Sequence, residues 1–232
     1  MTMSTPRKKS WKDSPAIWPL AGIVLLVLVN LFYGRNFFSI TVLDGHYYGT
    51  LVDIFIRGSV CMLLALCISL VIATGRIDFS VGSGMAIIAA VAAMMLQQGH
   101  SLVLVILACL AVGVVCGFIN GVLVSWASIQ PIVATLVLMV AGRGVAQLVT
   151  GDFQVPITDP AFSFLGNGYI AGVPFAPIFA TGLYLAAWLW LRRSAAGLFI
   201  EAAGDNESAS RFAGLATGRV KCLAYVVCGL TA

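Results

Sequence analysis

The chain carries very little charge for its length. Only 9% of its 232 residues are charged, whereas soluble domains carry about 25%. The mean hydropathy is +1.02, and because no soluble fold hides so much apolar surface, we expect the lipid bilayer to be the solvent. The net charge of +4 does not indicate nucleic-acid binding, since no basic groove with interleaved aromatic residues is present.

Patterns typical of enzymes and metal sites are also missing. The six cysteines lie in apolar runs without a CxxC pair or a nearby histidine, so we expect buried thiols and no metal. The sequence has no nucleotide-binding glycine loop, no HExxH and no GxSxG. No Asp or Glu lies in the middle of a predicted span, which weakens the alternative of a secondary carrier or channel. We therefore expect no enzymatic site and no cofactor in this chain.

Apolar runs of about 20 residues, the length that crosses the hydrocarbon layer, recur along the chain. They predict an all-α, polytopic membrane protein with about six or seven spans. The predicted spans are residues 16–33, 54–74, 79–96, 102–126, 131–150 and 172–191, with a seventh beginning near 220. Residues 1–15 are the predicted N-terminal tail, and residues 16–232 are the predicted membrane domain. The outer loop 151–171 is rich in Pro and Gly, which favours turns or a short re-entrant piece.

The distribution of Lys and Arg predicts the orientation. Four basic residues precede the first span and five follow the sixth, together nine of the thirteen in the chain. Because cytoplasmic loops are enriched in Lys and Arg, we expect a cytoplasmic N-terminus. Counting spans alternately then places the polar loop at about residues 194–219 in the cytoplasm as well.

Residues 197–221 form a polar island in this apolar sequence. Asn206 is a predicted N-cap of a short helix, with Glu207 at its first position and Gly214 as its C-terminal cap. Small side chains around one aromatic ring suit insertion into a cleft of another protein, while the alternative is a solvated loop that orients the spans. At spacings of three and four residues, one face of this helix carries Ala209, Phe212 and Ala213.

A second polar stretch, ATGRIDFSVGSG, occupies residues 73–84. We expect Asp78 or Ser80 to cap the helix that follows. The stretch fits a broken helix beside a transport path, which membrane depth tolerates only where protein or water surrounds it; the alternative is a short turn between spans. Its glycines, which permit a tight reversal or close packing, are Gly75, Gly82 and Gly84.

Two predicted spans carry further features that fit a polar path. Asn120 in the fourth span must face protein or water, and it lies beside a ridge of small residues. Arg143 in the fifth span costs about 3 kcal/mol at a helix centre, and Gln147 follows one turn later. An arginine and an amide facing inward suit sugar hydroxyls, whereas the alternative for the arginine is snorkelling or pairing with a carboxylate. The ridge, which lets another helix approach closely, consists of Gly113, Gly117 and Gly121.

The stretch LVIATGRIDFSVGSGMAI resembles the signature of permeases from bacterial ABC sugar importers of the ribose/xylose/galactofuranose type, whose usual form is close to GGIDLSVG. The stretch EAAGDNESASRFAGL resembles the loop by which those permeases dock on their ATPase. QPIVATLVLMVAGRGVAQLVTG and LDGHYYGTLVDIFIRG are similar to the galactofuranose-importing type. The likeness covers most of the chain from about residue 43 onward.

The resemblance implies a permease subunit in the bacterial inner membrane that imports a monosaccharide, either galactofuranose or a pentose such as ribose. The implied partners are a periplasmic sugar-binding protein, a second permease subunit that is identical or homologous, and cytoplasmic ABC ATPases that bind the ATP. The signature turn carries over to Gly75, Arg76, Asp78, Ser80 and Gly82. The docking pattern carries over to Glu201, Gly204, Asn206, Ala209 and Gly214, within a loop that also holds Asp205, Glu207, Arg211 and Phe212.

The chain departs from the family pattern in several places. Arg76 replaces a glycine, Phe79 replaces leucine, and Asp205 replaces a common second glycine. An arginine held at positive φ costs roughly 1 kcal/mol or more; if it faces the cytosol instead, we expect Asp78 as its partner. Family members are also longer, and residues 220–232 are too few to span a bilayer. We therefore expect the family's C-terminal helices to be missing, which leaves a non-transporting remnant as the alternative function.

Overall fold

The computed structural model describes residues 17–33, 37–43 and 45–232. The predicted N-terminal tail, residues 1–15, lies outside the described residues. The chain divides into two compact units, Met1–Ile54 and Phe55–Ala232.

The first unit contains one apolar helix and one hairpin. Helix α1 (Ile17–Tyr33) is apolar along its length, and its side chains from position 18 to 32 are exposed, as expected for a helix whose solvent is lipid. Strands β1 (Thr41–Leu43) and β2 (His46–Tyr48) pair antiparallel, with Thr41 opposite Tyr48. The unit ends in the first residues of α2 (Thr50–Ala73).

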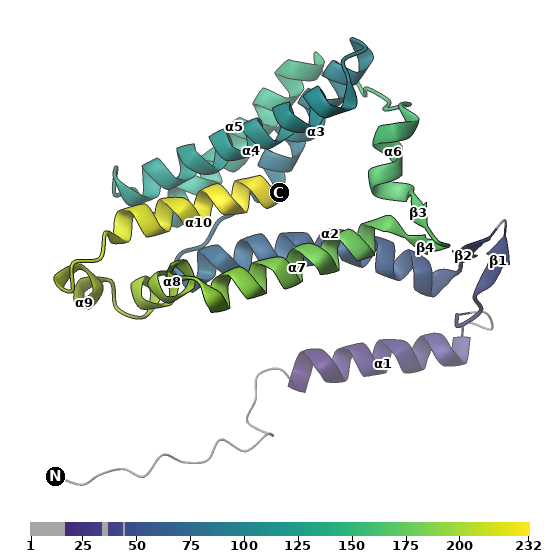
Figure 1. Cartoon of the computed structure of the whole chain (residues 1–232), viewed down its shortest axis with the longest axis horizontal. Helices are drawn as coiled ribbons and strands as arrows, with labels where there is room; N and C mark the ends of the chain where they lie inside the picture. Colours follow the sequence, from purple (N-terminus) through teal and green to yellow (C-terminus); the bar gives the residue numbers. More distant parts are fainter. Residues whose placement is uncertain (1–16, 34–36, 44) are drawn as a thin grey trace, which may run out of the picture. The chain divides into compact units, whose positions relative to one another are not determined.

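The second unit is a set of packed helices with one short hairpin (Figure 1). Within it, α3 packs against α4 and α5, and α10 packs along α4. This arrangement confirms the predicted all-α class. The elements after α2 are α3 (Val81–Gln97), α4 (Leu102–Ser125), α5 (Pro131–Thr150), α6 (Pro160–Asn167), β3 (Tyr169–Ile170), β4 (Val173–Pro174), α7 (Phe175–Arg193), α8 (Ala195–Asp205), α9 (Glu207–Phe212) and α10 (Thr217–Thr231).

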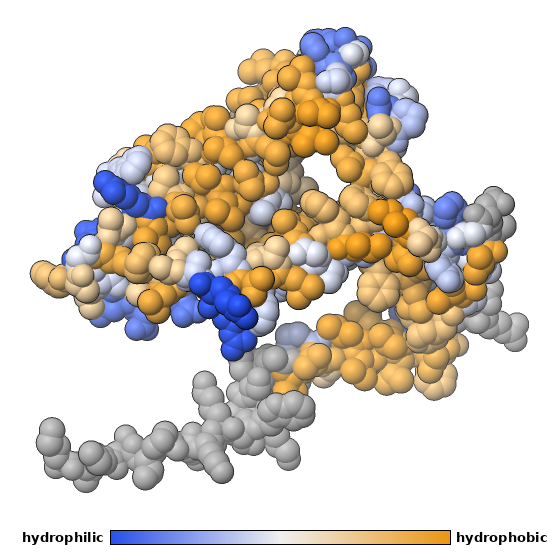
Figure 2. All heavy atoms as spheres, in the orientation of Figure 1, coloured by the Kyte–Doolittle hydropathy of each residue, from blue (hydrophilic) through white to orange (hydrophobic). Residues whose placement is uncertain are grey.

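Helices occur at every predicted span, but they differ in length. Among the described residues, four helices are long and apolar enough to cross a membrane: α2, α4, α5 and α7. Helices α1 and α3 have 17 residues each and α10 has 15, so the first two stand at the short end of the spanning range. Figure 2 shows apolar residues over most of the visible surface of α3 and α5, with hydrophilic residues mainly near helix ends.

The predicted glycine ridge of α4 is covered by α10. A Cβ placed on Gly113 would overlap the carbonyl oxygen of Gly229, and one on Gly117 would overlap that of Tyr225. Gly121 continues the same line against α10. The two backbones are therefore in direct contact, which confirms that the ridge serves close helix packing.

The loop 151–171 contains α6 and leads into the β3–β4 hairpin. The Oδ1 atom of Asp159 accepts a 2.9 Å hydrogen bond from the backbone N–H of Phe162, which caps α6. Prolines 156 and 160 and the glycines that follow α6 keep this helix to eight residues. The expected short piece between two spans is thus present.

Candidate functional site

The polar segment that follows α7 folds into two short helices. The sequence predicted α9 but not α8, because the residues of α8 are mostly apolar or small. A periodic signal was available, since the buried residues Gly197, Ile200 and Ala203 recur every third position. These residues hold α8 against α7 and α10, which gives α9 a fixed base.

Helix α9 has the predicted caps at both ends. The Oδ1 atom of Asn206 accepts a hydrogen bond of 3.0 Å from the N–H of Ala209, and Glu207 stands in the first turn, where a carboxylate favours the helix dipole. Gly214 has φ +86° and donates its N–H to the carbonyl of Arg211. That left-handed conformation favours glycine, so the chain leaves α9 sharply at this residue.

One face of α9 is anchored and the opposite face is open. The hydroxyl of Ser210, which is buried, donates a 2.8 Å hydrogen bond to the carbonyl of Ala202 in α8. Ala209 and Ala213 are exposed, and Phe212 is 94% exposed. The predicted small-residue face with one aromatic ring is therefore present and uncovered in this chain.

Three cationic groups converge on the carboxylate of Glu207. Its Oε2 atom lies 2.9 Å from Nη2 of Arg76, and its Oε1 atom lies 2.7 Å from Nη2 of Arg211 and 2.5 Å from Nζ of Lys221. The hydrogen bond from Lys221 is the largest effect that lowers the pKa of Glu207, and the nearby charges add to it while partial burial opposes it. Glu207, which the sequence placed in the docking loop and at the first turn of α9, is also the centre of an ion-pair cluster.

This cluster corrects the expected partner of Arg76. The sequence suggested Asp78, but the arginine reaches Glu207, which is 131 positions away in the chain. The φ angle of Arg76 is not positive; the left-handed residue of this turn is the preceding Gly75, with φ +75°. The arginine therefore causes no backbone strain there, and its side chain joins the turn to α9.

The turn between α2 and α3 also touches α8 through backbone. A Cβ on Gly204 would overlap the carbonyl oxygen of Ala73, and one on Gly75 would lie 3.6 Å from the carbonyl oxygen of Gly204. Any larger residue at Gly204 would push α8 away from the end of α2. The two motifs singled out in the sequence, the signature turn and the docking loop, are thus packed together.

A buried polar cluster begins at the same turn. The Oδ1 atom of Asp78 accepts hydrogen bonds from the backbone N–H and the hydroxyl of Ser80, at 2.8 and 2.7 Å. Nδ2 of Asn120 donates to the Ser80 hydroxyl at 2.5 Å. All three residues are buried, and desolvation raises the pKa of Asp78.

The predicted cap of α3 is wrong in its detail. Ser80 occupies the N-cap position, but its side chain makes no capping hydrogen bond. Asp78 reaches only the N–H of Ser80, one residue before the helix begins. Ser80 instead uses its hydroxyl to join Asp78 to Asn120, so the side chains expected to cap α3 connect the turn to α4. Gly82 and Gly84 have open space where a Cβ would stand.

The cluster closes one end of a groove between α3, α4 and α5. The groove encloses about 420 Å³ and is mostly apolar, with its polar lining supplied by Ser80, Ser83 and Asn120. The Oδ1 atom of Asn120 is buried and has no hydrogen-bond partner within the described part of the chain. A buried, unpaired amide oxygen favours an occupant with a hydroxyl or N–H group.

The other two candidate path residues lie elsewhere. Arg143 is exposed and does not line this groove, although its neighbour Gly142 does. Gln147 lines a separate cavity beside α3. Because one residue turns a helix by about 100°, the packing of Gly142 toward α3 directs position 143 away from it. The structure therefore does not bring these two residues together with Asn120, and their role in a path stays a prediction.

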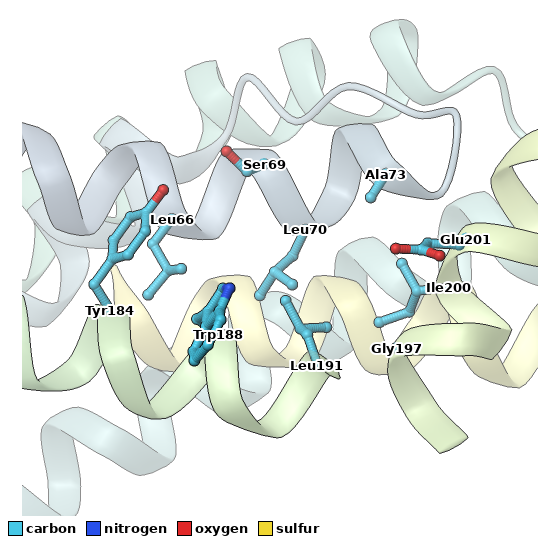
Figure 3. A pocket seen from close by; sticks show the side chains of 10 residues that line it. All are labelled: Leu66, Ser69, Leu70, Ala73, Tyr184, Trp188, Leu191, Gly197, Ile200 and Glu201. Carbon is cyan, nitrogen blue, oxygen red and sulfur yellow. The ribbon is translucent and has the colours of Figure 1, made fainter. Parts of the chain in front are cut away.

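A second groove of about 260 Å³ lies between α2, α7 and α8. Figure 3 shows its apolar floor and, at the end formed by α8, the carboxylate of Glu201. Trp188 lines the groove, and the guanidinium of Arg192 lies 5.3 Å from the centre of its ring. Glu201 thus stands on the side of α8 that faces α2, apart from the exposed face of α9.

Comparisons with known proteins agree with the sequence signature. Residues 50–232 match a family described as branched-chain amino acid transport system / permease component. The chain is 42% identical over 229 residues to the galactofuranose transporter permease protein YtfT of Escherichia coli strain K12, covering 99% of this chain and 67% of that protein.

Two further relatives are also named as sugar import permeases. The fructose import permease protein FruF of Bifidobacterium longum is 33% identical, covering 97% of this chain and 65% of that protein. The ribose import permease protein RbsC of Escherichia coli strain K12 is 35% identical, covering 92% of this chain and 65% of that protein. The chain therefore spans about two thirds of the length of these relatives. No solved structure gives a significant match.

Proposed function

The chain belongs to the permease component family of branched-chain amino acid transport systems, and we propose that it is the membrane subunit of an ATP-driven importer for a monosaccharide. The named relatives carry galactofuranose, fructose or ribose. Galactofuranose is our first choice of substrate because identity to that relative is 42%, and a pentose such as ribose is the second.

The open face of α9 is the observation that carries this proposal. A ring that is 94% exposed stands at the end of a helix that is capped at both ends. Such an exposed aromatic group flanked by small residues is typical of a residue that fills a partner's pocket. We propose that the loop at about residues 194–219 faces the cytoplasm and docks on the ATPase of the importer. This orientation places the N-terminus in the cytoplasm of a bacterial cell.

The groove between α3, α4 and α5 supplies the proposed path. Its buried amide oxygen at Asn120 and the hydroxyls of Ser80 and Ser83 are uncharged groups that suit a neutral sugar. We propose that a second permease subunit encloses the path together with this one, and that a periplasmic binding protein delivers the sugar. None of the described residues that line this groove is charged, which favours a neutral cargo over an ionic one.

Uptake by the reconstituted importer tests the proposal. The native permease is placed in liposomes with its ATPase and binding protein, and uptake of labelled galactofuranose, ribose and a branched-chain amino acid is followed with and without ATP. We expect ATP-dependent uptake of a sugar and none of the amino acid. An ATPase variant that binds but does not hydrolyse ATP is the control. Uptake of the amino acid alone, or sugar uptake that ignores ATP, would contradict the proposal.

A further inference from the structure

Arg76 and Glu207 form a bridge between two parts of the second unit that are far apart in sequence. We propose that this bridge transmits the movement of α9 to the signature turn, and through the turn to the polar end of the groove. The inference rests on the proposed function, because it assigns a transport role to a contact within the docking region. Arg76 is then a positioning residue, which acts on the path through other groups.

The two oxygens of the Glu207 carboxylate have different partners. Oε1 accepts from Arg211 of the same helix and from Lys221 of α10, whereas Oε2 accepts, among the described residues, from Arg76 alone. Charged hydrogen bonds of this kind are directional and short. Rotation or displacement of α9 therefore acts on the turn through one oxygen and on α10 through the other.

From Arg76 the connection continues into the membrane part without a break. Two residues later, the Asp78 carboxylate holds Ser80, and Ser80 holds Asn120 in α4. Asn120 and Ser80 line the groove. A displacement of the turn thus reaches the groups proposed to meet the sugar through a few hydrogen-bonded contacts, and chains of hydrogen bonds of this kind can carry coupling between sites.

The link from Glu207 to Lys221 leads to the close contact between α10 and α4. Lys221 is only 3% exposed, so its charge depends on Glu207 for compensation. It stands near the start of α10, which lies backbone to backbone on α4 through Gly117 and its neighbours. Lys221 therefore ties α9 to α10, whereas the partly exposed ion pair of Arg76 and Glu207 leads to the turn.

The competing explanation is that the ion pair of Arg76 and Glu207 only stabilises the fold. The two explanations predict different results when Arg76 is replaced. The side chains of Arg76 and Glu207 are 30% and 29% exposed, and partly exposed ion pairs contribute little to stability. Loss of Arg76 should therefore leave the fold and the membrane level unchanged. If the bridge transmits movement, that same change alters how much ATP is consumed for each sugar.

The experiment compares two arginines in different parts of the unit. Arg76→Gln removes the link from α9 to the turn, whereas Arg57→Gln removes the same charge from an exposed position in α2. The control position lies outside both the docking loop and the groove. Each variant of the native permease is reconstituted with its ATPase and binding protein, and ATP hydrolysis and sugar uptake are measured together.

We expect Arg76→Gln to raise the number of ATP molecules hydrolysed per sugar by about fivefold or more, which is the lower end of typical coupling factors. Arg57→Gln, an exposed substitution away from these contacts, should change that number less than about twofold. Arg76→Lys, which keeps the charge and can still reach the carboxylate, should restore most of the coupling. Arg76→Gly, which removes the link with the residue common in the family signature, should behave like Arg76→Gln.

Two results would overturn the inference while the proposed function stands. One is normal coupling in both Arg76→Gln and Arg76→Gly with normal sugar uptake. The other is equal loss of coupling in the Arg76 and Arg57 variants, because it would mean that loss of a positive charge matters wherever it occurs. Absence of ATP-driven sugar uptake by the unaltered permease would overturn the proposed function itself, and this inference with it.

Discussion

Truncation of Phe212 separates a docking helix from a solvated loop. The ring is 94% exposed in this chain, so Phe212→Ala removes almost no internal packing, and the free energy of unfolding should change by less than about 0.5 kcal/mol. Burial of a phenylalanine side chain at an interface contributes about 1.5–3 kcal/mol. We therefore expect the ATPase to bind about 30-fold more weakly, which corresponds to about 2 kcal/mol.

The measurement is a titration of labelled ATPase onto the permease in lipid nanodiscs. Phe212→Leu keeps most of the apolar volume and should weaken binding less than about threefold. Phe153→Ala is the matched control, because it removes a ring that is 78% exposed from the loop 151–171, outside the docking loop. The docking argument fails if Phe212→Ala binds within threefold of the unaltered permease, or if the Phe153 variant is impaired to the same extent.

Three other changes test separate parts of the structure. Gly117→Ala should lower the thermal unfolding temperature, because overpacking against the α10 backbone costs about 1–3 kcal/mol. Gly144→Ala, which has open space around it, is the control and should raise that temperature slightly. A thiol-reactive dye, which labels cysteines as they become exposed, measures the unfolding temperature of both variants. Asn120→Leu should reduce sugar uptake about 3- to 10-fold by removing one hydrogen bond, at an unchanged membrane level, and full uptake would exclude it from the path. Glu207 has a lowered pKa in the folded chain, so its stabilising effect is present above its unfolded pKa of about 4.3 and is lost as pH falls through the lower folded value. The unfolding temperature should thus fall more steeply below about pH 4.5 in the unaltered permease than in Glu207→Gln, and parallel curves would show that its three cationic partners do not depend on that charge.

The sequence predicted features whose causes are local. The caps of α9 at Asn206 and Gly214 follow from side-chain length and from the freedom of glycine, and both are confirmed. The small-residue ridge of α4 predicted a close helix partner, because the spacing of its glycines alone determines a flat surface. The sequence did not indicate that the partner would be α10.

The features that the sequence left open depend on long-range geometry. The pairing of Arg76 with Glu207 joins positions 131 apart, and no local pattern distinguishes Glu207 from the nearer Asp78 as its partner. Asp78 is unavailable because its carboxylate is buried and already accepts a hydrogen bond from the hydroxyl of Ser80. Similarly, Arg143 and Asn120 each suit a polar path by composition, but the rotation of α5 set by Gly142 determines that only Asn120 lines the groove.

The contact between α4 and α10 also means that α4 must wait for its packing partner while the chain is being synthesised. Gly121 faces Cys222, so the surface of α4 that carries the ridge is synthesised about a hundred residues before the helix that covers it. At typical elongation rates of about 5–20 residues per second, α4 therefore exists for roughly 5–20 s before the helix that covers its ridge is made.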